Sequence, residues 1–239
     1  MRKYERGARV ILYGKQPVFY AFNTCPWRIE EIYLTKELPR DIFSQLAKLN
    51  KPIKKLDFKK AQALAHGGNH QGILARITPP LPAHLNELKS KDSLLVLDNV
   101  TDVGNIGSIF RTAYALGVEG VIICLPSFSQ KAIESIARLS SGAFLHLPYG
   151  IFANIFDVVN ELKNANFTLI GADMNVGQKG KVGQKWALFL GSENQGLSGR
   201  LKHKLDTILS IQMAHHFDSL NVAVATGILI DRINYAGQK

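Results

Sequence analysis

The chain has 239 residues, of which 46% are hydrophobic, and a formal net charge of +10. This composition predicts a soluble globular protein with one large core or two modest ones, and it excludes a disordered chain. Residues 1–91 hold 17 Lys and Arg against 7 Asp and Glu, whereas residues 92–239 hold 12 of each. A basic part beside a neutral part indicates a surface that binds a polyanion, joined to a separate domain, with a merely solubilising surface as the alternative.

Strands and helices alternate along residues 9–77, which predicts a small α/β sandwich. The expected strands are 9–13, 29–34, 53–56 and 72–77, and the expected helices are 16–22, 41–49 and 58–65. Pro79, Pro80 and Pro82 follow, and they favour an extended linker because proline cannot continue a helix or a central strand. We therefore divide the chain into a first domain (1–78), a linker (79–92) and a second domain (93–239).

The second domain alternates again. Its expected strands are 94–97, 121–124, 144–147, 168–172, 187–190 and 207–211, and its expected helices are 106–116, 130–139, 152–162 and 220–230. Nearly continuous apolar strands between helices predict a mostly parallel sheet covered on both faces, and such sheets bind ligands beyond the carboxyl ends of their strands. Neither G-x-G-x-x-G after a strand nor a P-loop sequence occurs, so a dinucleotide site of the Rossmann type and a P-loop are not predicted.

The cysteines and the apolar runs indicate which other classes of protein the sequence does not predict. Cys25 and Cys124 form no C-x-x-C pair, so the sequence predicts neither a disulfide framework nor a zinc site. The first six residues include four charged side chains and no apolar run, and no apolar run elsewhere reaches the roughly 20 residues of a membrane span. We expect a cytoplasmic protein with no signal peptide, no membrane contact and no metal.

Three polar segments follow apolar runs in the second domain, and each combines Gly or Asn with a charged or hydroxyl side chain. They are Asn99–Ala113 (NVTDVGNIGSIFRTA), Leu188–Leu197 (LFLGSENQGL), and Ile211–Met213 (IQM) with Ser219–Ala225 (SLNVAVA). In this order they resemble the three motifs of the SpoU (TrmH-like) branch of the SPOUT methyltransferases. The resemblance extends over nearly the whole chain, because residues 11–77 look like the SpoU substrate-binding domain, a small L30e-like α/β module.

The resemblance implies transfer of a methyl group from S-adenosylmethionine to a ribose 2′-hydroxyl in RNA. The segment His70-Gln71-Gly72 is typical of the RlmB-like branch, which methylates a guanosine in 23S rRNA. The family resemblance further implies a trefoil-knotted second domain and a homodimer. The implied catalytic residues are Asn105, Arg111, Glu193, Ser219 and Asn221. The implied cofactor-binding residues are Gly191, Ile211, Met213 and Leu220.

Elementary chemistry gives several of these residues a second interpretation. A free guanidinium stays protonated, so Arg111 can pair with a substrate phosphate and stabilise a developing alkoxide, or it can form an ion pair that serves the fold. Asn105 suits the N-cap of the predicted helix, which is compatible with a role in the site. Asn221 is unexpected among apolar neighbours in a helix, because Asn is a poor interior residue there.

The sequence departs from the family pattern at Val103, where Pro is usual, at His215 and His216, and at Ala223. The two histidines are adjacent and have no acidic or cysteine cluster to complete a metal site, so proximity to RNA is the better interpretation. Two alternatives remain open for the function. One is methylation of a tRNA guanosine, and the other is a catalytically silent RNA-binding or ribosome-assembly protein.

Overall fold

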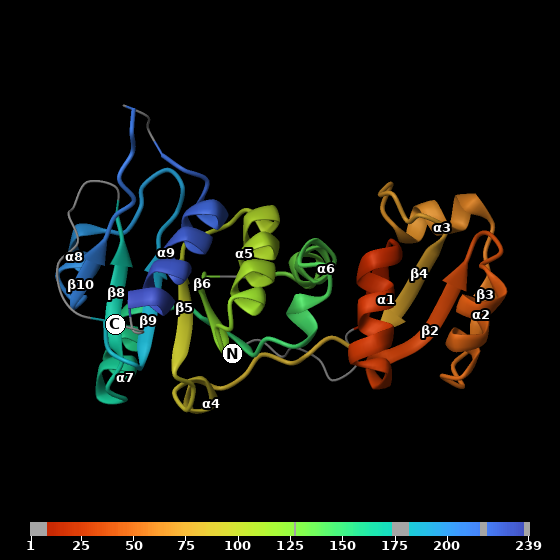
Figure 1. Ribbon diagram of the computed structural model, residues 1–239, viewed down its shortest axis with the longest axis horizontal. Coiled ribbons are helices and arrows are strands. Elements are labelled where there is room, and N and C mark those ends of the chain that lie inside the picture. The colour runs from red at the N-terminus through yellow and green to blue at the C-terminus, as the bar shows by residue number, and fades with distance from the viewer. Residues whose placement is uncertain (1–8, 127, 174–181, 216–218, 237–239) are drawn as a thin grey trace. The chain divides into compact units, whose positions relative to one another are not determined.

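The computed structural model describes residues 9–126, 128–173, 182–215 and 219–236, which are shown in Figure 1. They divide into two compact units. The first takes in the residues up to Leu81 together with 129–146, and the second takes in 82–128 and the residues from Leu147 onward. The change from the first unit to the second at Leu81 falls inside the predicted linker. The return of residues 129–146 to the first unit has no counterpart in the sequence-based division.

The first unit contains a four-stranded sheet with the strand order β1-β4-β2-β3. Its strands are β1 (Val10–Tyr13), β2 (Ile29–Leu34), β3 (Ile53–Lys55) and β4 (Ile73–Ile77). Its helices are α1 (Lys15–Thr24), η1 (Pro26–Arg28), α2 (Arg40–Ala47), α3 (Phe58–Leu64), α6 (Gln130–Leu139) and η2 (Ala143–Leu145). The strands and helices predicted between residues 9 and 77 are all present, with ends shifted by at most two residues. Strand β4 pairs antiparallel with β1 and β2, and β2 pairs parallel with β3.

A charged cluster lies on this sheet. Glu31 is only 5% exposed and receives a hydrogen bond of 2.5 Å from the Tyr33 hydroxyl. Lys54 forms an ion pair with the same carboxylate, and Arg76 forms another at 3.2 Å. The hydrogen bonds from Lys54 and then Tyr33 lower the pKa of Glu31, so this buried side chain remains a carboxylate.

The second unit contains a six-stranded parallel sheet with the strand order β10-β8-β9-β5-β6-β7. Its strands are β5 (Ser93–Asp98), β6 (Gly120–Cys124), β7 (Tyr149–Phe152), β8 (Thr168–Ala172), β9 (Trp186–Leu190) and β10 (Thr207–Leu209). Its helices are α4 (Leu85–Leu88), α5 (Val103–Ala115), α7 (Ile155–Asn164), α8 (Gly199–Lys202) and α9 (Val222–Ala236). The predicted parallel sheet is therefore confirmed.

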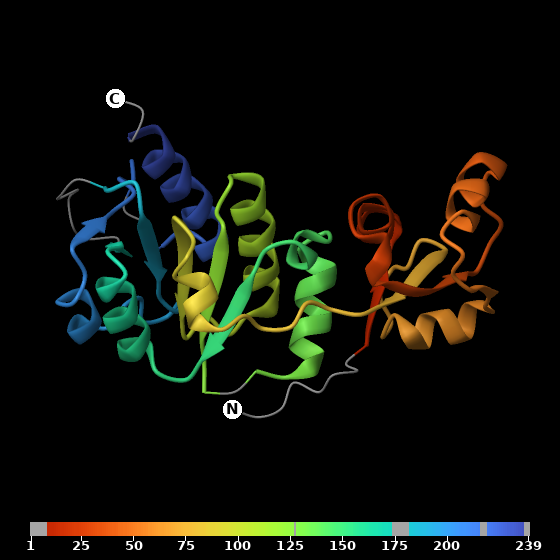
Figure 2. The same cartoon turned by 90° about the horizontal axis from the view of Figure 1, so that it is seen from below.

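Helices cover both faces of this sheet, as Figure 2 shows. Helices α5 and α9 pack against each other on one face. The other face is covered by α4, α7 and α8, which contribute Leu88, Val158, Val159, Leu162 and Leu201 to a core shared with the strands. Because both faces are buried, the central strand β5 presents four consecutive apolar residues, Leu94–Leu97, that are all fully buried.

The prediction of a strand at 144–147 is wrong. Residues 143–145 form the 3-10 helix η2, and the strand begins after Pro148, at Tyr149. The Ser140 hydroxyl oxygen accepts a hydrogen bond from the Phe144 N–H at 3.2 Å, which holds this apolar run in a turn. A short apolar run carries no period that separates a strand from a buried turn. The helix predicted from residue 152 accordingly begins later, at Ile155, where Asn154 caps it.

Among the helices within the described residues, none is long and apolar enough to cross a membrane.

Candidate active site

The three polar segments lie at the carboxyl edge of the parallel sheet. The first segment follows β5, the second follows β9, and the third follows β10 and leads into α9. Because β10, β8, β9 and β5 are parallel neighbours, their carboxyl ends meet at the same edge. Residues separated by more than 100 positions in the chain are thereby brought together.

The first segment forms the start of α5. Asp102 is the N-cap of this helix, and its Oδ1 accepts a hydrogen bond from the Asn105 N–H at 2.7 Å. The interpretation of Asn105 as the N-cap is therefore wrong, because an acid three positions earlier takes that role. The Asn105 side chain is available for other contacts, and its Nδ2 donates a hydrogen bond to Oε1 of Glu193 in the second segment.

The third segment completes a chain of hydrogen bonds. Asn221 lies just before α9, and its Oδ1 accepts from the N–H groups of Ala223 at 2.9 Å and Val224 at 3.4 Å. Its Nδ2 donates to Oδ1 of Asn105 at 2.8 Å. Asn221 is thus a helix cap, which explains a residue that was unexpected inside a helix.

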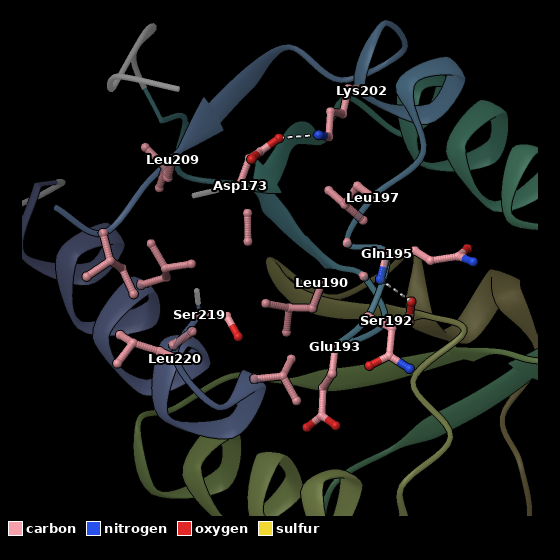
Figure 3. Close-up of a pocket in the computed structure, with 18 of the residues that line it drawn as sticks. Asp173, Leu190, Ser192, Glu193, Gln195, Leu197, Lys202, Leu209, Ser219 and Leu220 are labelled. Atoms are coloured by element: carbon pink, nitrogen blue, oxygen red, sulfur yellow. Dashed lines mark hydrogen bonds and ion pairs between the residues drawn. The ribbon is translucent and has the colours of Figure 1, made fainter. Parts of the chain in front are cut away.

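A cavity of about 300 Å³ opens beside Glu193, the last residue of this chain of hydrogen bonds, as Figure 3 shows for Glu193. All four residues predicted to bind the cofactor line it, and so do two of the predicted catalytic residues. These are Gly191, Ile211, Met213 and Leu220, and Glu193 and Ser219, respectively. Asn105 and Asn221 are not part of the wall and reach it through Glu193.

Arg111 lies apart from the cavity wall. It is an exposed residue of α5, and among the described residues it forms no ion pair. The alternative, that Arg111 forms an ion pair that serves the fold, therefore has no support among the described residues. The guanidinium faces solvent and can meet an anionic ligand.

Gly191 is required by the shape of the loop after β9. A Cβ atom at this position would lie 2.1 Å from the carbonyl carbon of Gly196, which is closer than any real contact. The Gly196 N–H donates to the Ser192 carbonyl oxygen at 2.7 Å, and Gly196 itself has a φ of +61°. The tight loop therefore needs glycine at both positions, and it brings Glu193 to the cavity.

Two buried acidic groups lie at the ends of neighbouring strands. Burial raises the pKa of Asp98, and a hydrogen bond from Asn99 partly opposes this shift. Burial, followed by the nearby Asp98, raises the pKa of Cys124 to about 12. The Cys124 thiol therefore stays protonated at neutral pH, and nucleophilic chemistry at this cysteine is excluded.

The described residues contain no group of three or more His, Cys, Asp or Glu side chains that could hold a metal ion. His215 is exposed, and His216 lies outside the described residues.

The sequence analysis missed one charged pair in the wall. Asp173 follows β8 and forms an ion pair with Lys202 of α8, and both residues line the cavity. The position of Asp173 directly after a parallel strand was the signal that could have found it. Lys202 offered no such signal, because it lies in a short helix that was not predicted.

Comparison with known proteins identifies the family of this chain. Residues 92–231 match the model of the SpoU rRNA Methylase family, and residues 11–83 match the model for RNA 2′-O ribose methyltransferase substrate binding. A protein of Staphylococcus saprophyticus assigned to the TrmH family of tRNA/rRNA methyltransferases is 34% identical over 185 residues, which cover 71% of this chain and 74% of the relative. The chain therefore belongs to the SpoU rRNA methylase family, and the predicted enzyme class, a methyltransferase, is confirmed.

Solved structures show the same fold. The SpoU methyltransferase AviRb from Streptomyces viridochromogenes, in complex with the cofactor AdoMet, is 24% identical, with a TM-score of 0.75 over 98% of this chain and 91% of that chain. An AdoMet-bound rRNA methyltransferase from Sinorhizobium meliloti is 21% identical, with a TM-score of 0.77 over 95% of this chain and 87% of that chain. The predicted fold class is confirmed by these likenesses.

Proposed function

We propose that this protein transfers a methyl group from S-adenosylmethionine to the ribose 2′-hydroxyl of a guanosine in 23S rRNA, and that it acts as a homodimer. The observation that carries the proposal is the hydrogen-bonded chain Asn221–Asn105–Glu193, in which each of the three motifs supplies one residue. This chain ends on the wall of a cavity that the predicted cofactor residues line.

The direction of the hydrogen bonds indicates what these residues do. The Oδ1 of Asn221 accepts from the first turn of α9, so its Nδ2 must donate to Asn105, and Asn105 must in turn donate to Glu193. Glu193 is thereby held as an acceptor at the cavity. An oriented acceptor can align a ribose hydroxyl, and holding the reacting atoms near attack distance is a large part of such catalysis.

The cofactor supplies an electrophilic methyl group on a sulfonium. With the cofactor bound, the ribose oxygen would bond to the methyl carbon as the carbon–sulfur bond breaks and S-adenosylhomocysteine leaves, and the hydroxyl proton would pass to the Glu193 carboxylate, the acceptor held at the cavity. A guanidinium is a permanent cation with a fork of N–H donors, so the proposed role of Arg111 is to bind the RNA phosphate beside the reacting ribose and to stabilise the developing negative charge.

The basic first part of the chain supports RNA as the substrate. Residues 1–91 carry the whole excess of positive charge, and two aromatic side chains of the first unit, Trp27 and Phe58, are 71% and 69% exposed. Lysine and arginine bind phosphates with an affinity that falls as salt rises, and exposed aromatic rings can stack on unpaired bases. Structured rRNA loops offer such bases.

Exposed apolar side chains on α5 and α9 support the homodimer. Val224 and Tyr235 of α9 are 53% and 64% exposed, and Tyr114 of α5 is 39% exposed. These two helices pack against each other, so the apolar residues belong to one helical layer. Large exposed apolar residues on one layer indicate a protein interface, and closed dimers bury the same surface of both copies.

Methyl transfer from S-adenosylmethionine to unmodified 23S rRNA and to unmodified tRNA, in separate reactions, tests the proposal. The nucleosides are identified by mass spectrometry, and light scattering gives the oligomeric state. We expect new 2′-O-methylguanosine in the rRNA and the mass of a dimer. Methylation of tRNA alone would support the proposed reaction and contradict 23S rRNA as its substrate. RNA binding without methylation or cofactor binding would favour the silent RNA-binding protein.

A further inference from the structure

The ion pair of Asp173 and Lys202 lies at the end of the cavity opposite Glu193, as Figure 3 shows. The Asp173 side chain is 12% exposed and the Lys202 side chain 35%. Most of the wall between the two ends is formed by apolar side chains, among them Leu190, Leu209 and Leu220. A charged pair at one end of a mostly apolar cavity is a polar anchor point for a ligand.

Hydrogen bonds of the main chain fix the backbone positions of both residues. The Asp173 N–H donates to the Leu209 carbonyl oxygen at 3.0 Å, which ties the end of β8 to β10. Ser198 caps α8, and the Lys202 N–H donates to the Ser198 carbonyl oxygen at 3.0 Å. The main chain at both residues is therefore fixed, and the ion pair joins the two side chains across the gap between β8 and α8.

Fold stability alone is a poor reason for this pair. Taking charge out of water offsets much of the attraction between the two groups, and the exposed part of Lys202 is screened by solvent, so this partly buried ion pair contributes little net stability. Hydrogen bonding of the carboxylate to a ligand would explain why the ion pair lies in the cavity wall.

We propose that the carboxylate of Asp173 accepts hydrogen bonds from the cis-diol of the cofactor ribose, and that Lys202 is the positioning residue that holds this carboxylate in place. The inference rests on the proposed function, because it names the part of S-adenosylmethionine that the pair recognises. A carboxylate with its acceptor oxygens suits two adjacent hydroxyl donors, as in ribose recognition by dinucleotide-binding proteins. Lys202 meanwhile offsets the charge of Asp173.

The position of Asp173 favours the ribose over the amino-acid end of the cofactor. Its N–H donates to the Leu209 carbonyl oxygen, so Asp173 lies beside the end of β10, and Leu209, Ile211 and Met213 from this end of β10 and the segment after it line the same cavity as an apolar surface that can bury a flat adenine. The ribose is bonded directly to adenine, whereas the amino-acid end is separated from it by the ribose and the sulfur. A neutral ion pair also offers little net attraction to a zwitterion, but its carboxylate oxygens still accept from hydroxyl groups.

Fixing the ribose also aims the methyl group. The sulfur is bonded to the 5′ carbon of the ribose, so an anchor at the Asp173 end leaves the sulfonium to extend toward Glu193. Recognition at one end of the cavity thereby sets the approach of the methyl group at the other end.

Calorimetry on the intact protein with three ligands tests the assignment. S-adenosylhomocysteine has both the diol and the amino-acid group, 5′-methylthioadenosine has the diol only, and 2′,3′-dideoxy-5′-methylthioadenosine has neither. For the unsubstituted protein we expect the loss of the diol to raise Kd by about 10- to 100-fold, the size expected for hydrogen bonds to a charged group. This comparison needs no variant and so does not depend on the folding of one.

Asp173→Asn should weaken the binding of S-adenosylhomocysteine and 5′-methylthioadenosine by the same factor and leave the dideoxy ligand unaffected. Lys202→Met should reproduce part of this loss, and Lys202→Arg should restore it, while the thermal midpoint of each unliganded variant reports folding. A loss for S-adenosylhomocysteine alone would assign the pair to the amino-acid end and overturn the proposal. Equal affinities of the unsubstituted protein for the two smaller ligands would also overturn it. If the unsubstituted protein binds S-adenosylhomocysteine but its affinity does not depend on the diol and Asp173 as expected, the proposed function stands and only this inference fails. If the unsubstituted protein does not bind S-adenosylhomocysteine, both proposals fail.

Discussion

Asn221 donates its side-chain N–H to the side-chain oxygen of Asn105 at 2.8 Å, across 116 positions of the chain. The same Asn221 caps α9 with its side-chain oxygen. Its amide therefore has one orientation only. If the oxygen and nitrogen were exchanged, the cap would be lost and the amide NH₂ would face the N–H donors of Ala223 and Val224. The cap of one helix thus sets the orientation of the amide at the start of another.

Asn221→Asp separates the two uses of this side chain. Aspartate is as good an N-cap as asparagine, so we expect the thermal midpoint to stay within a few degrees. The ionised carboxylate cannot donate to Asn105, and it adds a negative charge near Glu193. We expect kcat for methyl transfer to fall by about 100-fold, the cost of misplacing reacting groups. Unaltered kcat would show that the orientation of Asn105 has no part in turnover.

Asn221→Ala is the matched control, because it removes both the cap and the donor. It should lose the same activity as Asn221→Asp and, in addition, about 1 kcal/mol of stability for the lost cap. Urea unfolding of the two variants measures this difference.

Arg111→Ala should lower kcat by about 100-fold or more while stability changes by no more than about 0.5 kcal/mol, because an exposed residue without an ion pair within the described structure contributes little to the fold. Arg111→Lys keeps the charge and loses the planar two-pronged donor, so we expect it to recover only a small part of the activity. Single-turnover assays with saturating cofactor give these rates. Full activity of the alanine variant would contradict the role in RNA binding and charge stabilisation.

Gly191→Ala should damage the cavity, because its Cβ would collide with backbone atoms of Gly196. We expect loss of detectable S-adenosylhomocysteine binding, together with a stability loss of a few kcal/mol as the loop shifts. Gly199→Ala is the control, since nothing lies within 4 Å of its Cβ and it begins helix α8. The control should bind normally and be at least as stable as the parent, because alanine is the better helix former.

Much of the fold could be predicted because its sequence pattern is local. The alternation of strands and helices and the continuous apolar strands predict the elements and the parallel sheet, and the order of motifs along such a sheet predicts that Gly191, Ile211 and Leu220 share one edge. The prediction failed at a short apolar run, residues 144–147, because its conformation depends on a hydrogen bond from the Phe144 N–H to the Ser140 hydroxyl oxygen.

The finer contacts of the site could not be predicted, because they join distant parts of the chain. The cap on α5 is a competition between Asp102 and Asn105, two good capping residues, and only the backbone path decides it. The ion pair of Asp173 with Lys202 depends on a four-residue helix whose position is set by tertiary packing. Sequence periods cannot detect so short an element.

Glu31 should make the free energy of unfolding of the first unit decrease at acidic pH. Lys54 and Tyr33 lower the pKa of this carboxyl in the folded protein, whereas in the unfolded chain it is near 4.3. The stabilisation is therefore fully present above the unfolded value, and it is lost as the pH falls through that value toward the lower folded one. Glu31→Gln should be less stable at pH 7 and should lose less additional stability between about pH 5 and pH 3, as urea unfolding across this range would show. Glu37→Gln, at an exposed position, is the matched control and should follow the parent at every pH. If Glu31→Gln has the same acid dependence as the parent, the coupling of this cluster to folding is wrong.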